Sequence, residues 1–159
     1  SASLQKSEQE LLKAVSSPPA LTASTVDWSS ADRIIRDQAF RDAILELYDE
    51  RCAVCGASRY APNGTPAVEA AHIYPKSERG ADDVRNGLAL CKTHHWAFDV
   101  GWFGLRDDNS LVVQNREDVT GYEEFKRFSK RRIHFPESEE HRPHEIFKRA
   151  HRELHGLGG

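Results

Sequence analysis

The chain has 159 residues, 38% of them hydrophobic and 30% charged, which predicts one globular domain and excludes a disordered or fibrous protein. Its apolar runs are shorter than the roughly 18 residues of a membrane span, and its start does not resemble a signal peptide. We therefore expect a cytoplasmic protein without a membrane partner. The net charge of -3 argues against a protein that holds nucleic acid by bulk electrostatics alone.

The sequence contains no methionine, not even at position 1, and we expect it to be part of a larger protein with a separate recognition domain.

The first 30 residues are expected to form a helix and a linker. Residues 4–16 carry leucine and valine at near-helical spacing, and this pattern stops before a Pro-Pro pair. Residues 17–30 are rich in Pro, Ser and Thr, which is typical of a linker. We therefore divide the chain into an N-terminal segment over 1–30 and a main domain over 31–159. The N-terminal helix could be a dimerisation arm, a lid or a helix packed on its own domain.

The middle of the chain predicts two strands and a helix, with a long polar loop between the strands. An apolar stripe at helical spacing first predicts a helix over 37–50, which leads directly into a Cys-x-x-Cys pair. The elements that follow are a strand over 68–73, a loop over 75–87, a strand over 88–90, and a helix over 94–100 with Thr93 as its N-cap.

The C-terminal part predicts a hairpin and further helices. Residues 102–105 and 111–114 flank an Asp-Asp-Asn turn and indicate a β-hairpin. Helices are predicted over 122–131 and over 143–155, so we treat 115–159 as a helical extension. Helices and short strands in this order predict an α+β fold.

All three cysteines fall into a pattern typical of a zinc site. Cys52-x-x-Cys55 and Cys91-x-x-His94 are two pairs of ligands separated by 36 positions. The odd cysteine count, without secretory context, argues against disulfides. Zn²⁺ accepts thiolate and imidazole together, and four protein ligands leave no open position, so we expect a structural ion. Two alternatives stay open: buried thiols that act as small hydrophobic side chains, and His95 in place of His94.

A second group of residues predicts hydrolytic chemistry. His95 and Asp99 are four positions apart on the predicted helix, so both project from one face and can hold one divalent cation. We expect His72, on the first strand, and Asn86, at the end of the loop, to face this helix. A histidine can activate water near neutral pH, and a divalent ion can stabilise the charge that develops during phosphodiester hydrolysis. The alternative is that His72 and Asn86 are ordinary strand and turn residues.

These residues resemble a known family. His72, Asn86 and His95 are similar to the three signature residues of the HNH nucleases, the ββα-metal superfamily, in its zinc-ribbon-flanked form. The segments AAHI, NGLALC and HHWAFD look like the HNH domains of bacterial restriction and modification-dependent endonucleases. The resemblance covers about 40–105, and it implies a ββα-metal core with a structural zinc, flanked here by additional helices and a small hairpin.

The resemblance also implies a role for each matching residue. His72 would be the general base, and Asn86 would fix the loop and orient it. His95 and Asp99 would bind the catalytic ion, which would be Mg²⁺, Mn²⁺ or another divalent ion. Glu69 matches an acidic position that supports a phosphate-contacting arginine in some members.

One position departs from the family pattern. Many members carry Asp or His directly before the base as an additional metal ligand, and here that residue is Ala71. Either the ion has two protein ligands and more water, or a carboxylate from elsewhere completes its shell. Ala71 also favours the alternative of a zinc-stabilised DNA- or protein-binding module without catalysis.

Basic residues in two segments are predicted to contact DNA phosphates. One run of seven residues holds five cations: Lys126, Arg127, Lys130, Arg131 and Arg132. The loop between the predicted base and the helix adds Lys76, Arg79 and Arg85. The alternative for the first segment is a solvated helix face.

The sequence therefore predicts a metal-dependent DNA endonuclease, the cleavage domain of a bacterial restriction system that acts on double-stranded DNA. A homodimer is one route to double-strand cleavage, because one ββα site cuts one strand. Besides the non-catalytic binding module, an RNA-directed or toxin-type HNH nuclease is the other alternative.

Overall fold

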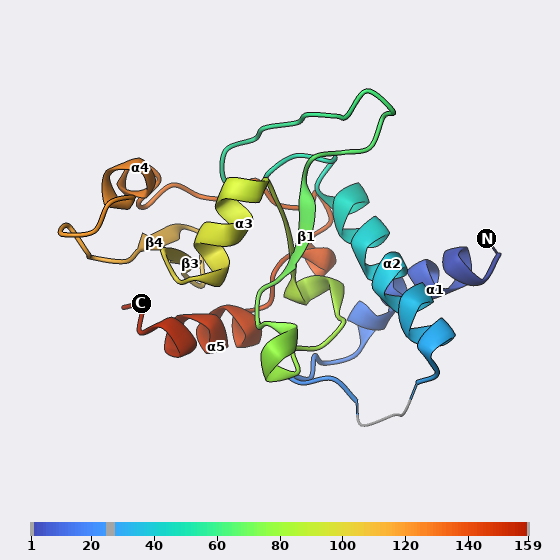
Figure 1. Cartoon of the computed structure of the whole chain (residues 1–159). Coiled ribbons are helices and arrows are strands. Elements are labelled where there is room, and N and C mark those ends of the chain that lie inside the picture. Colours follow the sequence, from blue (N-terminus) through green and yellow to red (C-terminus); the bar gives the residue numbers. More distant parts are fainter. Residues whose placement is uncertain (1, 25–27, 159) are drawn as a thin grey trace.

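The computed structural model describes residues 2–24 and 28–158, in which helices pack around two small antiparallel sheets (Figure 1). In chain order the elements are α1 (Ala2–Lys13), α2 (Ser30–Leu47), β1 (Glu69–His72), β2 (Gly87–Leu90), α3 (Lys92–Asp99), β3 (Phe103–Leu105), β4 (Leu111–Val113), α4 (Tyr122–Lys126) and α5 (Glu145–His155). This arrangement confirms the predicted α+β class. No helix in the described ranges is long and apolar enough to span a membrane.

Helix α2 packs between α1 and the sheet formed by β1 and β2. It begins at Ser30 rather than near the predicted position 37, because Ser29 provides an N-cap whose side chain accepts a hydrogen bond from the backbone of Asp32. Its first turns are exposed, including Ile34, so no apolar stripe marks them in the sequence. The second half buries Phe40 and Ile44, among others, against the sheet.

The two strands pair in antiparallel register, with His72 opposite Gly87 and Ala71 opposite Leu88. Gly87 has no side chain because a Cβ there would collide with Ile44 of α2. The hydroxyl of Tyr48 donates a hydrogen bond of 3.0 Å to the carbonyl of Gly87. Helix α2 therefore lies directly against the strand that leads into α3, and the sheet carries His72 at its edge toward the loop.

The loop between the strands and the start of α3 differ in detail from the prediction. The loop contains two 3-10 turns, Lys76–Glu78 and Val84–Asn86. Helix α3 begins at Lys92, and its N-cap is Cys91 rather than Thr93. Cys91 is in an extended conformation without a side-chain cap, since its thiol points toward the other cysteines instead.

The C-terminal part packs around the hairpin of β3 and β4. Helix α4 ends at Lys126, not at the predicted position 131, because the backbones of Lys130 and Arg131 exchange hydrogen bonds with Leu111 beside β4. Helix α5 packs against β3 and ends at Gly156, whose backbone is left-handed as expected for a helix terminus.

Candidate functional site

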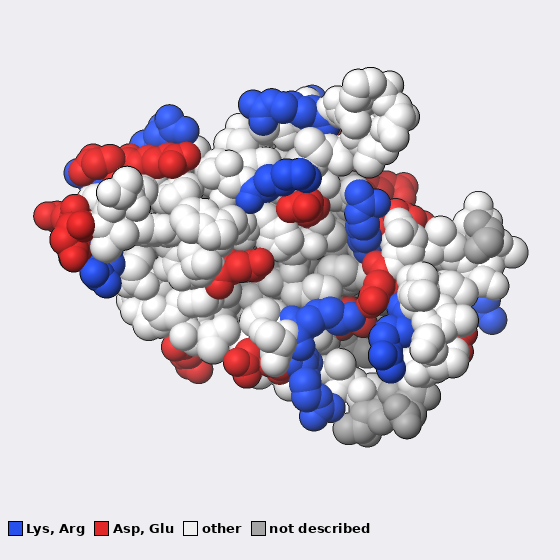
Figure 2. Space-filling view, viewed as in Figure 1, with Lys and Arg blue, Asp and Glu red and all other residues white. Residues whose placement is uncertain are grey.

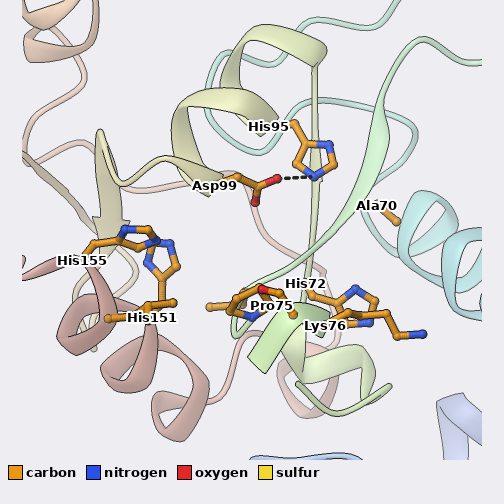
Figure 3. A pocket seen from close by; sticks show the side chains of 11 residues that line it. Ala70, His72, Pro75, Lys76, His95, Asp99, His151 and His155 are labelled. Carbon is orange, nitrogen blue, oxygen red and sulfur yellow. Dashed lines mark ion pairs between the residues drawn. The ribbon is translucent and has the colours of Figure 1, made fainter. Parts of the chain in front are cut away.

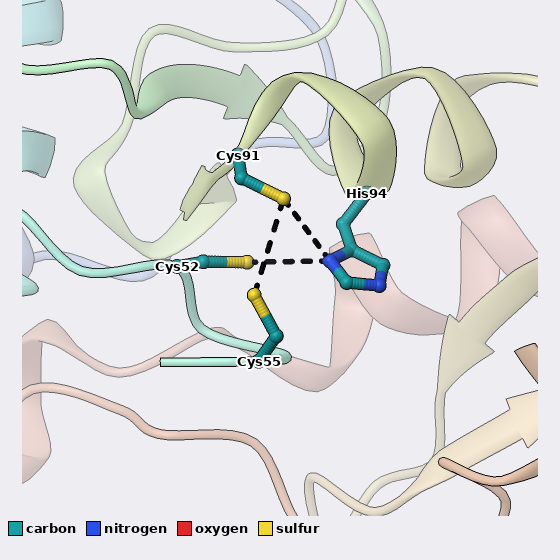
Figure 4. Close-up of side chains that lie close together, drawn as sticks. All are labelled: Cys52, Cys55, Cys91 and His94. Carbon is teal, nitrogen blue, oxygen red and sulfur yellow. Dashed lines mark hydrogen bonds between the residues drawn. The ribbon is translucent and has the colours of Figure 1, made fainter. Parts of the chain in front are cut away.

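The three cysteines and one histidine of the predicted metal pattern come together where β2 enters α3 (Figure 4). The ligand atoms of Cys52, Cys55, Cys91 and His94 all lie within 4.8 Å of one another. Nδ1 of His94 is 3.1 Å from Sγ of Cys91 and 3.7 Å from Sγ of Cys52. The sulfurs of Cys55 and Cys91 are 4.0 Å apart, which excludes a disulfide between them.

This cluster has the donors and the spacing of a tetrahedral metal site. Ligand atoms around a tetrahedral zinc are roughly 3.3–3.8 Å apart, given the usual Zn–S and Zn–N bond lengths. Burial raises the pKa of the Cys52 thiol to about 12, so a thiolate at this position needs a positive partner. Burial also lowers the pKa of His94, which favours the neutral imidazole that metals bind. The four residues could therefore hold a zinc ion.

His95 lies between two carboxylates on the other side of α3. Its Nδ1 is 3.0 Å from Oε1 of Glu69. Its Nε2 is 3.2 Å from Oδ2 of Asp99, the pair that Figure 3 shows. The hydrogen bond to Asp99 is the main cause that raises the pKa of His95, and Glu69 adds to it against the effect of burial. Partial burial acts to raise the pKa of Glu69, but His95 and Lys92 together lower it.

The pair formed by His95 and Asp99 fits a divalent cation. Two neighbouring ligands of an octahedral ion such as Mg²⁺ lie about 3 Å apart, close to the observed 3.2 Å. Glu69 binds the other ring nitrogen of His95, as outer carboxylates do behind metal-binding histidines. In neutral His95, Nδ1–H would then face Glu69 and leave the Nε2 lone pair toward Asp99. Two acceptors that face each other in this way require a proton or a cation between them.

Glu69 therefore contacts a histidine, not an arginine as the resemblance had implied. Its charged neighbours in the described ranges are His95 and Lys92, whose Nζ lies 3.5 Å from Oε2. Lys92 is on the exposed first turn of α3. The carboxylate orients the proposed metal ligand, and the lysine partly neutralises it.

His72 is held by partners that the sequence did not identify. Its Nε2 lies 2.8 Å from Oδ1 of Asp82, and its ring stacks on Phe40 of α2, with ring centres 4.1 Å apart and planes 16° apart. Burial acts to raise the pKa of Asp82, but the hydrogen bond from His72 and the nearby charge of Lys76 lower it overall. No sequence pattern indicates this pairing, since Asp82 is one of two adjacent aspartates in a polar loop.

Asn86 is fully buried and fixes the loop rather than touching the ring of His72. Its Oδ1 accepts a hydrogen bond from the backbone N–H of Tyr74, and its Nδ2 donates to the carbonyls of Tyr74 and Ala81. Its backbone carbonyl also accepts from the N–H of Ile73. Asn86 thus joins the residues that follow His72 to those that precede Asp82.

One cavity of about 600 Å³ brings the proposed catalytic groups together (Figure 3). His95 and Asp99 from α3 line it on one side, and His72 lies across from them. His151 and His155 of α5 line a further side, and no sequence pattern had linked α5 to this cavity.

Ala71 does not line this cavity; it is buried in the core beneath the sheet, and Ala70 faces the cavity instead. No third carboxylate or imidazole stands close enough to His95 and Asp99 to form a three-ligand group within residues 2–24 and 28–158. Among the described residues, His95 and Asp99 are therefore the two candidate protein ligands for a divalent ion at this place.

A neighbouring pocket shares His72, Lys76 and His95 with this cavity and extends toward α2. Its lining includes three cations, Arg41, Lys76 and Lys92, of which only Lys76 was singled out in the sequence. Lys76 pairs with Asp37 at 2.7 Å, whereas Arg41 makes no ion pair with any part of the chain that the structure describes. Figure 2 shows Lys and Arg side chains around the hollow on this face of the molecule.

The other cations predicted to contact DNA either lie away from the cavity or already bind groups of the protein. Arg85 is buried, pairs with Asp83 at 2.8 Å, and donates to the carbonyls of Val15 and Ser17, so this placement argues against a contact with DNA. Arg79 is exposed and reaches the carbonyl of Ala23 at 3.5 Å.

The five cations of the run over 126–132 are exposed, but they lie in or near α4 and β4, away from the cavity. Arg127 and Arg131 flank the ring of Phe128, and Arg132 donates to the carbonyl of Asp108.

Comparisons with known proteins agree with this geometry. Residues 52–106 match the family model described as HNH endonuclease. The chain is 32% identical over 89 residues to the type IV methyl-directed restriction enzyme EcoKMcrA of Escherichia coli (strain K12), which covers 54% of this chain and 32% of that enzyme. A modification dependent TagI restriction endonuclease has a similar fold, with a TM-score of 0.55 and 24% identity, over 72% of this chain and 36% of that one.

The chain thus spans about a third of the length of each of these two proteins. The matched residues include the cysteine cluster and both sides of the cavity, from His72 to Asp99. Over residues 52–106 the chain is therefore similar to HNH endonucleases, and it resembles a restriction enzyme of this kind.

Proposed function

We propose that the protein is a metal-dependent DNA endonuclease that hydrolyses phosphodiester bonds as the cleavage domain of a bacterial restriction system. The observation that carries this proposal is the arrangement of His72 opposite the pair of His95 and Asp99 in one cavity. A base and a metal-binding pair that face each other are the two parts that hydrolysis of a phosphodiester needs.

His72 acts as the general base in this proposal. Stacking on Phe40 and the hydrogen bond to Asp82 hold its ring in one orientation at the cavity wall. It accepts a proton from the water that attacks phosphorus. Asn86 keeps the two chain segments around the ring in place through its buried hydrogen bonds.

His95 and Asp99 hold the catalytic ion, for which Mg²⁺ or Mn²⁺ is the natural choice with one imidazole and one carboxylate. The bound ion would stabilise negative charge on the phosphate and on the leaving 3′ oxygen. Glu69 keeps Nδ1 of His95 protonated, so that Nε2 can face the ion. Zn²⁺ is proposed for the cysteine cluster, where it holds the turn after α2 to the start of α3.

The DNA strand is proposed to cross the neighbouring pocket between α3 and α2, which shares His72 and His95 with the cavity. Arg41 and Lys92 line this pocket, and Arg41 is available because it has no ion pair in the described structure. Lys76 contributes from the loop. These three cations surround the catalytic groups, unlike the run over 126–132.

The two similar restriction enzymes are described as methyl-directed and as modification dependent. We propose that recognition of the site belongs to a separate domain, as expected from the sequence, and that double-strand cleavage requires a homodimer or two successive nicks.

A cleavage assay tests the proposal directly. Supercoiled plasmid, methylated plasmid and single-stranded RNA are each incubated with the protein in Mg²⁺, in Mn²⁺ and in chelator. We expect plasmid to be nicked or linearised only with a divalent ion. Cleavage of RNA alone would favour the RNA-directed alternative, and binding of DNA without cleavage under either ion would favour the non-catalytic module.

A further inference from the structure

Of the two ring nitrogens of His72, one is hydrogen-bonded and the other has no hydrogen-bond partner among the described residues. Nε2 lies 2.8 Å from Oδ1 of Asp82, in a pair whose side chains are only 15% and 13% exposed. Nδ1 makes no hydrogen bond to any residue that the structure describes, although His72 lines the cavity. Phe40, stacked under the ring, prevents it from tilting toward another partner.

The partner of Nε2 dictates where the proton of neutral His72 resides. Ionised Asp82 can only accept hydrogen bonds, so the nitrogen that faces it must carry the hydrogen. Neutral imidazole has one N–H, and therefore Nδ1 must keep its lone pair. A base needs this lone pair, because only an unprotonated nitrogen can take a proton from water.

We propose that Asp82 is the positioning residue of the general base: it holds His72 in the Nε2–H tautomer and leaves Nδ1 to activate water. The proposal rests on the proposed nuclease function, and it goes beyond that function by assigning a residue that the HNH pattern of His72, Asn86 and His95 does not include.

The surrounding contacts explain why Asp82 is held in place. Asn86 donates a hydrogen bond of 2.9 Å to the carbonyl of Ala81, next to Asp82, and also binds Tyr74, two residues after His72. Asn86 thus fixes the separation of the base and its partner, and so orients His72 indirectly. Lys76 lies 3.5 Å from Oδ1 of Asp82 and helps to keep the carboxylate ionised.

The proton and the bonds balance in the resulting step. Water loses a proton to Nδ1 of His72 as its oxygen forms a bond to phosphorus and the bond from phosphorus to the 3′ oxygen breaks. The 3′ oxygen takes a proton from solvent, and imidazolium later returns its proton from Nδ1 to solvent. Asp82 stays ionised throughout and stabilises the transient positive charge of His72 through Nε2–H.

The test compares Asp82→Asn, Asp82→Glu and a control. The amide of Asn can donate as well as accept and so allows the wrong tautomer; in serine proteases the equivalent change lowers kcat about 10⁴-fold. We expect Asp82→Asn to lower kcat by about 10²- to 10⁴-fold with little change in KM, and Asp82→Glu to recover part of the loss. Asp37→Asn is the matched control, because Asp37 binds the same Lys76 but does not contact His72.

Tautomer measurement separates positioning from a merely structural role. Long-range ¹H–¹⁵N spectra of the full chain, at a pH where His72 is neutral, should show the Nε2–H tautomer in the wild type and a mixture in Asp82→Asn, with metal content and circular dichroism unchanged. An Nδ1–H tautomer in the wild type, or a kcat of Asp82→Asn within twofold of that of Asp37→Asn, would overturn the proposal. A wild type that cleaves no nucleic acid contradicts the nuclease function, and the spectra then still decide the tautomer.

Discussion

His94 and His95 are adjacent in α3, but their side chains point to different sides of the helix. Nδ1 of His94 is 3.1 Å from the sulfur of Cys91, whereas Nδ1 of His95 is 3.0 Å from the carboxylate of Glu69. Successive residues of a helix point about 100° apart, so one short helix connects the cysteine cluster to the cavity. Any change that shifts the start of α3 therefore moves the proposed catalytic ligand as well.

Removal of one cysteine ligand should release zinc and destabilise the fold. Cys55→Ser is the suitable change, because Cys55 is exposed and nearly isosteric with Ser, so little packing is lost. Zinc content should fall from about one equivalent per chain, and the melting temperature should drop, because zinc binding in small zinc domains is worth on the order of 10 kcal/mol.

Chelator provides the control for this prediction. It should lower the melting temperature of the wild type toward that of Cys55→Ser and should barely change the variant. A wild type that contains no zinc, or a variant as stable as the wild type, would show that the cluster consists of buried thiols instead.

Glu69→Gln should weaken binding of the catalytic ion without abolishing the chemistry. The amide loses the charge that orients His95, and changes of this kind typically cost about 10- to 100-fold in metal affinity. The half-saturating Mn²⁺ concentration for cleavage should rise accordingly, while kcat at saturating Mn²⁺ stays close to that of the wild type. Glu117→Gln, on the exposed surface, is the control and should not shift the curve. An unchanged Mn²⁺ titration for Glu69→Gln would contradict this role.

Arg41→Ala should weaken DNA binding more than Arg127→Ala. Arg41 lines the neighbouring pocket, which it shares with His72, and Arg127 lies in the run over 126–132 near α4. Loss of one phosphate contact should reduce the slope of log K against log[salt] by about 1. Fluorescence anisotropy with a labelled duplex over a series of salt concentrations measures both slopes. The opposite ranking would place the DNA path along the 126–132 run.

The stability of the fold should fall in mild acid because of His151. Burial is the largest influence on this histidine, and it lowers the pKa of the side chain to about 4. The unfolded state therefore binds the proton more readily, so His151 contributes stability that is complete above about pH 6.5 and is lost as the pH falls toward 4. The loss is on the order of 3 kcal/mol.

His151→Phe isolates this contribution. Phe can keep the stacking on Phe98, whose ring centre is 3.9 Å away, but it does not titrate. Urea unfolding at pH 7.5, 5.5 and 4.5 should show a smaller loss of stability for the variant than for the wild type. Equal losses in the two proteins would assign the acid sensitivity to other groups.

The sequence predicted the parts of the site that follow from short spacings. Turn geometry and helical periodicity fix the pairs Cys52/Cys55, Cys91/His94 and His95/Asp99 locally. The two halves of the cysteine cluster are 36 positions apart, and they were joined because zinc takes four such ligands.

Contacts between segments that are distant in the chain could not be predicted from residue spacing. The pairing of Asp82 with His72 depends on how the loop folds back, and Arg41 lies near His72 only because α2 packs on the sheet. The position of the run over 126–132 away from the cavity could not be predicted for the same reason, since local charge density does not tell which face of the molecule carries it.

Plasmid cleavage with His72→Ala shows whether His72 is the base. His134→Ala, which removes an exposed histidine outside the cavity, serves as the control. With Mn²⁺ or Mg²⁺, we expect His72→Ala to lose cleavage by about 10²- to 10⁴-fold while zinc content and circular dichroism match the wild type, and His134→Ala to cleave normally. Cleavage by His72→Ala at the wild-type rate would contradict the assignment of His72 as the base of a metal-dependent endonuclease.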